Sequence, residues 1–169
     1  MKLDKIIKYL EVANAVSKLS KDESTKVGAV ILGKDSMEIR SLGYNGAPRG
    51  CAADEDDDRS ARPEKYFWFE HAERNAIFNA ARIGTPLAGS TLLVTHPPCM
   101  DCARAIVQAG ICEVFWPKPD PEFGKRWIEH KFRVIRLFNE CGINFDEIDM
   151  TEKPVPLGPL FTPTEELFK

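Results

Sequence analysis

Two short stretches of this chain must meet when it folds. The first is His71-Ala72-Glu73 and the second is Pro98-Cys99-Met100-Asp101-Cys102. One histidine and two cysteines suit Zn²⁺, which prefers tetrahedral nitrogen and sulfur coordination. Three protein ligands leave the fourth position open for water, whereas a structural zinc site is usually closed by a fourth protein ligand. The two stretches therefore predict a fold that brings His71, Cys99 and Cys102 together around one Zn²⁺ per chain.

Glu73 favours a catalytic zinc site over a structural one. It lies two residues beyond His71, close enough to reach a zinc-bound water without being a ligand itself. H-x-E followed by P-C-x-x-C is the pattern of zinc-dependent nucleobase deaminases, with the glutamate as general acid/base. Each half alone is common, but a structural site would need a second pair of ligands at similar spacing. The other cysteines and histidines are isolated: Cys51, Cys112, Cys141, His96 and His130.

Composition limits the class of protein. The 169 residues, of which 43% are hydrophobic, suffice for one domain with a full core. Five cysteines, two of them assigned to metal, argue against a disulfide framework and for a reducing compartment. The apolar runs are too short to cross a membrane and Met1–Asp4 lacks a signal-peptide pattern, so we expect a cytoplasmic protein. A net charge of −3 gives no footprint for long nucleic acids, which favours a small-molecule substrate.

Hydrophobic periodicity predicts an α/β fold with helices on both faces of one sheet, a three-layer α/β/α arrangement. The helices between the last three strands supply the crossovers that parallel pairing requires. Both metal-binding stretches fall at helix N-termini, where the positive end of the helix dipole favours thiolate. Helices are predicted over 3–19, 71–83, 99–109 and 123–140, and strands over 27–32, 37–43, 90–95 and 111–116, with a fifth strand beginning at Gly142.

The segments between these elements carry further predictions. The loop 43–50 holds three glycines and a proline, and Asn45 within it is well placed to contact a ligand at a strand end. Residues 51–65 form a charged, irregular excursion, and the four aromatic residues at 66–69 are expected to pack under it or to form a subunit contact. We expect one deaminase domain over 1–150 and a proline-rich tail over 151–169.

The sequence resembles the deoxycytidylate (dCMP) deaminase group of the cytidine deaminase superfamily. The zinc motif is common to the whole superfamily, whereas the Gly-Tyr-Asn-Gly-x-Pro-x-Gly loop points towards dCMP. The matching stretches are Lys26-Val27-Gly28-Ala29-Val30-Ile31, Gly43-Tyr44-Asn45-Gly46-x-Pro48-x-Gly50-Cys51, His71-Ala72-Glu73-x-Asn75-Ala76-Ile77, Pro98-Cys99-x-x-Cys102-Ala103 and Gln108-Ala109-Gly110-Ile111.

The resemblance implies a central mixed sheet of five strands, with strands four and five parallel. It implies hydrolysis of dCMP to dUMP and ammonia, assembly into homo-oligomers, often hexamers, and regulation by dCTP and dTTP. It assigns Asn45 to the sugar hydroxyl and the backbone of Ala72 to the base edge. Lys26 and Arg49 are the candidate phosphate contacts, although each is as readily interpreted as a solvated surface cation.

Two other functions compete with dCMP deamination. The first is deamination of another substrate: a 5-substituted dCMP, a cytidine nucleoside or a base within RNA. The RNA alternative would need a cationic track, against which the acidic excursion argues. The second is a non-catalytic interaction module stabilised by zinc. Glu73, which a structural zinc site does not need, weighs against that module.

Overall fold

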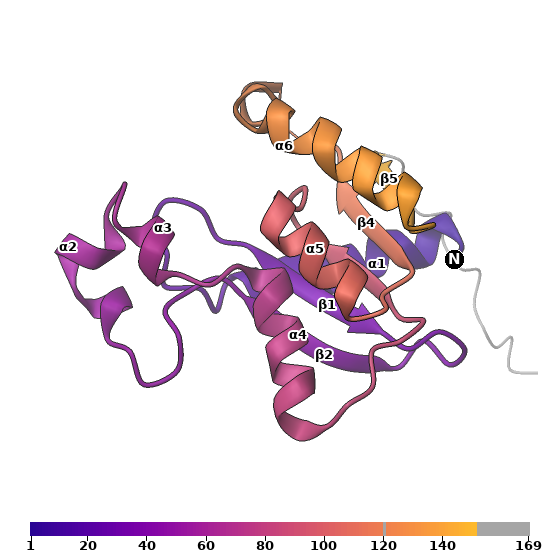
Figure 1. The fold of residues 1–169 in the computed structure, drawn as a ribbon, viewed down its shortest axis with the longest axis horizontal. Coiled ribbons are helices and arrows are strands. Elements are labelled where there is room, and N and C mark those ends of the chain that lie inside the picture. The colour runs from indigo at the N-terminus through magenta and orange to yellow at the C-terminus, as the bar shows by residue number, and fades with distance from the viewer. Residues whose placement is uncertain (120, 152–169) are drawn as a thin grey trace, which may run out of the picture.

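A computed structural model describes residues 1–119 and 121–151 of the chain (Figure 1). Within these residues five strands form one sheet in the order β2-β1-β3-β4-β5. β1 pairs antiparallel with both β2 and β3, whereas β3, β4 and β5 run parallel, so the predicted mixed sheet is confirmed. The strands are β1 (Gly28–Leu32), β2 (Ile39–Tyr44), β3 (Thr91–Val94), β4 (Glu113–Pro117) and β5 (Asn144–Ile148).

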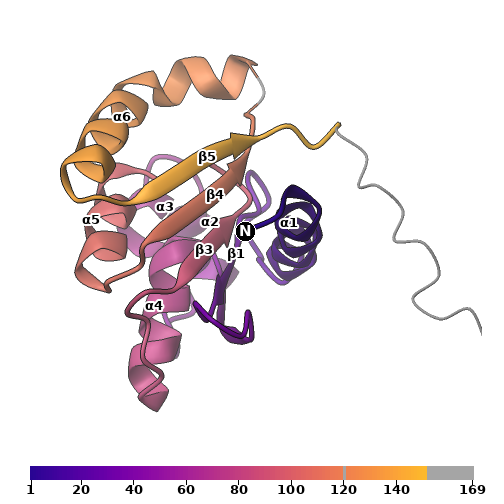
Figure 2. The same ribbon diagram turned by 90° about the vertical axis from the view of Figure 1, so that its right-hand side faces the viewer.

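Helices cover both faces of this sheet, as predicted. α1 (Leu3–Ser17) lies on one face, and α4 (Ala72–Ile83), α5 (Met100–Gln108) and α6 (Pro121–Glu140) lie on the other (Figure 2). Each of these helices begins and ends within a few residues of its predicted range. The excursion and the aromatic run after it hold three short helical segments that the sequence did not indicate: η1 (Ala53–Glu55), α2 (Asp57–Ser60) and α3 (Lys65–Trp68).

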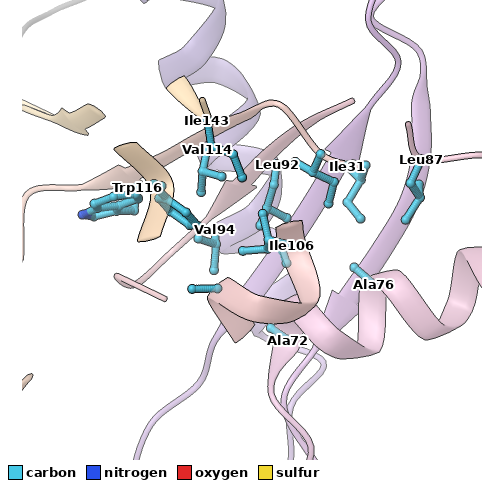
Figure 3. Packing of buried hydrophobic residues seen from close by; sticks show 14 of the residues in the cluster. Ile31, Ala72, Ala76, Leu87, Leu92, Val94, Ile106, Val114, Trp116 and Ile143 are labelled. Atoms are coloured by element: carbon cyan, nitrogen blue, oxygen red, sulfur yellow. The ribbon is translucent and has the colours of Figure 1, made fainter. Parts of the chain in front are cut away.

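Strand β1 explains why both layers of helices are needed. All five of its residues are buried, and successive side chains of a strand point to opposite faces. Val30 and Leu32 pack against α1, whereas Ala29 and Ile31 join the cluster beneath α4 and α5 (Figure 3). Fully burying one such aliphatic side chain contributes roughly 1.5–3 kcal/mol. The central strands are therefore stable only with a helical layer on each side.

Helix α4 lies unusually close to the backbone of β2, and the contact depends on Gly43. A Cβ atom at this position would lie 2.2 Å from the carbonyl oxygen of Ala72 and 2.4 Å from the backbone nitrogen of Ala76. Two side chains add hydrogen bonds across the same contact, Ser41 Oγ to Ala76 O (2.6 Å) and Asn79 Nδ2 to Leu42 O (2.7 Å). The first turn of α4, which carries Glu73, is thereby held on the sheet.

The aromatic run at the end of the excursion differs from its prediction. Tyr66, Phe67 and Trp68 are 56%, 80% and 40% exposed, so they are not buried under the excursion, although Arg59 of the excursion lies over the Trp68 ring. Lys65, and not an aromatic residue, takes the buried position of the short helix α3. The alternative, a subunit contact, stays a prediction.

Apart from Thr151, the proline-rich tail over 151–169 lies outside the described residues. Within the described part of the chain, no helix combines the length and the apolar character that a membrane span requires.

Substituting Gly43 by alanine should lower the free energy of unfolding by about 1–3 kcal/mol, the usual cost of overpacking a close contact. The added methyl group must push α4 away from β2, so zinc binding should weaken in the same variant. Gly46→Ala is the matched control, because its Cβ would meet nothing within 4 Å. Urea denaturation measures both variants. A Gly43→Ala protein as stable as the control would contradict the close contact.

Candidate active site

The three predicted metal ligands meet at one point. His71 Nδ1 lies 3.5 Å from Cys99 Sγ and 3.5 Å from Cys102 Sγ, and all three ligand atoms lie within 4.8 Å of one another. Zinc bond lengths of about 2.0–2.1 Å to nitrogen and about 2.3 Å to sulfur, at a tetrahedral angle, imply a nitrogen–sulfur separation of about 3.5 Å. Both nitrogen–sulfur separations therefore match those of a tetrahedral zinc site. In the described part of the chain it is the one such cluster of potential metal ligands.

Two helix starts place these ligands. His71 is the extended residue directly before α4, and Cys99 is the extended residue directly before α5. Cys102 follows in the first turn of α5, buried beneath Cys99. Because both helices begin at the same cavity, the positive ends of their dipoles favour the thiolate form that binds zinc.

The three ligand side chains shift one another's pKa values. Hydrogen bonds from Cys102 and from His71 lower the pKa of the Cys99 thiol to about 4, against the effect of burial. The same contact with Cys99, together with burial, raises the pKa of the Cys102 thiol. The hydrogen bond to Cys99 raises the pKa of His71 to about 9. Zinc binding therefore has to displace the protons on His71 and Cys102, because the metal binds neutral imidazole and thiolate.

Glu73 lies beside this cluster but outside it. Its side chain is buried, 3% exposed, and burial raises the pKa of its carboxyl group. A raised pKa makes the carboxyl group hold its proton more readily than an exposed glutamate, as suits a general acid/base. Glu73 lies in the wall of the cavity that holds the ligands.

A cavity of about 370 Å³ opens over the cluster, within the usual size range of small-molecule sites. His71, Ala72, Glu73 and Cys99 line it, as does Asn45 from the glycine-rich loop. The excursion contributes one wall, and two histidines that the sequence left isolated contribute another. The other lining residues are Asp22, Thr25, Val27, Arg62, Lys65, Tyr66, Phe69, Glu70, His96, Pro97 and His130.

Asp22 and Lys65 form a buried ion pair in this cavity that the sequence did not reveal. Lys65 Nζ lies 2.7 Å from Asp22 Oδ2, and the two side chains are 7% and 5% exposed. The second carboxylate oxygen of Asp22 accepts hydrogen bonds from Ser24 N (2.8 Å), Ser24 Oγ (2.8 Å) and Thr25 N (3.1 Å). The Asp-x-Ser-Thr sequence is typical of such an Asx turn, but nothing local points to Lys65.

Asn45 belongs to the same network. Its amide oxygen accepts a hydrogen bond from Val27 N (2.7 Å), and its amide nitrogen donates to Asp22 Oδ2 (3.1 Å) and Thr25 O (2.9 Å). The side chain therefore fixes the loop on the strand that follows Val27. Contact with a sugar hydroxyl stays a prediction for this residue.

The two predicted phosphate contacts lie away from the cavity lining. Lys26 Nζ donates to Ser20 O (2.7 Å), and Arg49 hydrogen bonds to Asn79 on α4. The cations that do line the cavity are Arg62 and Lys65. Lys65 is paired with Asp22, whereas Arg62 is exposed and has no hydrogen bond or ion pair with any described residue.

Asp22→Asn should destabilise the protein by about 3–5 kcal/mol at pH 7, because it leaves a buried Lys65 charge unpaired. Burial alone would raise the pKa of Asp22, but the hydrogen bonds from Lys65 and Ser24 lower it below 3.8. A lowered folded-state pKa gives stability that is present above the unfolded pKa and is lost as the pH falls through the folded pKa. The difference in unfolding free energy between the unmodified protein and Asp22→Asn should therefore shrink as the pH falls below about 3.9.

Chemical denaturation at a series of pH values measures this difference. Asp35→Asn, at an exposed turn position, is the control and should stay near the unmodified protein throughout. Equal stability of the Asp22 and Asp35 variants at pH 7 would show that the ion pair does not form.

The comparison with known proteins agrees with this site. Residues 3–117 match the family described as "Cytidine and deoxycytidylate deaminase zinc-binding region". A protein of Aliivibrio fischeri named "Uncharacterized deaminase in luxG 3'region" is 40% identical over 137 residues, covering 80% of this chain and 88% of its own. Human deoxycytidylate deaminase is 38% identical over 142 residues, covering 81% and 75% respectively.

A solved structure extends the likeness to the fold. The dCMP deaminase of cyanophage S-TIM5, in complex with dCMP and dUMP, superposes with a TM-score of 0.67 at 28% identity. The match covers 87% of this chain and 98% of the phage chain. With the family match and the His/Cys/Cys cluster in place, the chain belongs to the zinc-dependent cytidine and deoxycytidylate deaminase family.

Proposed function

We propose that the protein hydrolyses dCMP to dUMP and ammonia. The observation that carries this proposal is a buried carboxyl group, Glu73, next to a His/Cys/Cys cluster in a cavity of small-molecule size. A structural zinc site has no use for such a carboxyl group, and burying it unpaired is costly. Likeness to relatives named for dCMP, one of them solved with dCMP and dUMP, supports the nucleotide as substrate.

Each residue of the site has its own role in the proposed deamination. When bound by His71, Cys99 and Cys102, Zn²⁺ supplies a Lewis acid that activates water for attack on C4 of the cytosine ring. Glu73 accepts the proton of that water and delivers it to N3 of the ring. The same carboxyl group then helps to protonate the departing ammonia, so that one water is consumed for each ammonia released. The backbone at Ala72 faces the base edge.

The phosphate of the substrate needs a cationic partner in the cavity. Besides the predicted contacts Lys26 and Arg49, the cavity itself presents Arg62 and Lys65. We favour Arg62, because its guanidinium group has no partner among the described residues and can pair with phosphate in a bidentate way. Asn45 is proposed for the sugar hydroxyl.

We further propose that the protein is a homo-oligomer of the cytoplasm, a hexamer by analogy with its family, whose activity dCTP and dTTP regulate. Exposed aromatic side chains at Tyr66, Phe67 and Trp68 support a contact between subunits, because adjoining apolar groups of this size are rarely left to water. Size-exclusion chromatography with light scattering tests the oligomer directly.

Ammonia release from the zinc-loaded protein tests the proposed substrate. Activity on dCMP should exceed activity on deoxycytidine at least tenfold in kcat/KM, because each charge-assisted hydrogen bond to phosphate contributes about 1.5–3 kcal/mol. Glu73→Gln is the control: it should retain one zinc per chain but lose ~10²- to 10⁴-fold in turnover. Equal use of the two substrates would refute nucleotide specificity, and normal turnover in a zinc-loaded Glu73→Gln protein would refute the mechanism.

Alanine variants of three cations locate the phosphate in the same assay. Arg62→Ala should lower kcat/KM for dCMP about tenfold and leave the slow reaction of deoxycytidine unchanged. Lys26→Ala and Arg49→Ala should change neither reaction. A selective loss in either of those two variants would place the phosphate there and remove it from Arg62.

A further inference from the structure

His130 reaches the zinc site from a helix that carries no ligand. It lies on α6, which packs beside α5 (Figures 1 and 2), and it lines the cavity together with Cys99. Its Nδ1 atom lies 3.2 Å from the backbone nitrogen of Met100, which donates the hydrogen bond. Met100 is the residue between Cys99 and the rest of α5.

The contact satisfies a backbone group that the helix cannot satisfy itself. The first N–H groups of any α-helix have no partner within the helix, and Met100 is the first residue of α5. The side chain of the N-cap residue, here Cys99, reaches only the N–H groups of the second and third helical residues, so the Met100 N–H needs an acceptor from another element. His130 of α6 supplies that acceptor. Because the N–H can only donate, Nδ1 must carry a lone pair, and the proton of the neutral ring lies on Nε2.

We propose that His130 is a positioning residue of the zinc centre. Its Nδ1 atom fixes the peptide group that joins Cys99 to Met100, and so holds the Cys99 sulfur, with Cys102 one turn further on, in ligand geometry. His130 is not itself a ligand, since the cluster of ligand atoms consists of His71, Cys99 and Cys102 alone among the described residues. The proposal rests on the zinc site and is independent of which substrate the enzyme deaminates.

Two substitutions separate the acceptor from the bulk of the ring. In His130→Asn the amide oxygen can occupy the place of Nδ1, whereas in His130→Gln it reaches the place of Nε2 instead. Zinc affinity is measured by competition with a chromophoric chelator, and needs no turnover. His130→Gln should bind zinc about tenfold more weakly than the unmodified protein, within the range that outer partners of metal ligands contribute. His130→Asn should stay within about threefold of the unmodified protein.

A second pair of variants removes the donor and leaves His130 untouched. Met100→Pro deletes the N–H at a position where proline is well tolerated, and Cys99 already has the extended backbone, φ −79° and ψ 172°, that a following proline requires. Met100→Ala loses the same side chain but keeps the N–H. Met100→Pro should therefore bind zinc about tenfold more weakly than Met100→Ala.

The two pairs together form a double-mutant cycle. Adding His130→Gln to Met100→Pro should cause no further loss of zinc affinity, because the hydrogen bond is already absent. Glu129→Ala, at an exposed position of α6, controls for general effects on the helix and should bind zinc normally. Circular dichroism of each zinc-loaded variant checks that it is folded.

Three results would overturn the proposal. Equal zinc affinity of the Gln variant and the unmodified protein would show that the acceptor has no influence on the metal site. Equal loss in the Asn and Gln variants would assign the effect to the ring and not to Nδ1. Additive losses in the double variant would show that His130 and the Met100 N–H act separately.

Discussion

The site depends on the convergence of two helix N-termini on one cavity. His71 directly precedes the first residue of α4, and Cys99 directly precedes the first residue of α5, which follows β3 after a short connection. Both helices pack on the same face of the sheet and contact each other (Figures 1 and 2). The close approach of Gly43 to α4 and the hydrogen bond from His130 to α5 each hold one of these helix starts. A small shift of either helix would separate the ligand atoms.

Burial of the polar side chains makes the site reactive and also lowers the stability of the fold. A carboxyl group, two thiols and an imidazole share a space from which water is largely excluded, and isolated charges in such a space are unfavourable. Zinc stabilises the buried ligands because its divalent charge replaces their protons, so metal binding and folding are coupled. At Asp22 and Lys65 the cost is met by pairing and by hydrogen bonds from Ser24, Thr25 and Asn45. The cavity therefore holds two sets of buried polar side chains: the ligand cluster, which zinc stabilises, and the Asp22–Lys65 pair, which hydrogen bonds stabilise.

The parts that could be predicted from sequence are those that local patterns determine. The spacing of His71 and Glu73 places both at the start of one helix, and the spacing of Cys99 and Cys102 places both at the start of another. β1 was predictable because a strand covered on both faces must be apolar throughout. By contrast, the Asp22–Lys65 pair joins residues 43 positions apart, and its formation depends on the path of an irregular excursion. His130 was invisible for the same reason: its role arises only from the packing of α6 beside α5. For the aromatic run the sequence left two alternatives, packing under the excursion or a subunit contact, and the exposure of Tyr66, Phe67 and Trp68 leaves the subunit contact as the prediction.

The central claim is that zinc is held by one nitrogen and two sulfurs of the protein, with one position left for water. X-ray absorption at the zinc edge of the metal-loaded protein in solution measures this directly. The account predicts two sulfur scatterers at about 2.3 Å and two lighter scatterers at about 2.0–2.1 Å, one being His71 and the other water. Four protein ligands, recognised by three or four sulfur scatterers, would make the site a closed structural one and contradict the account.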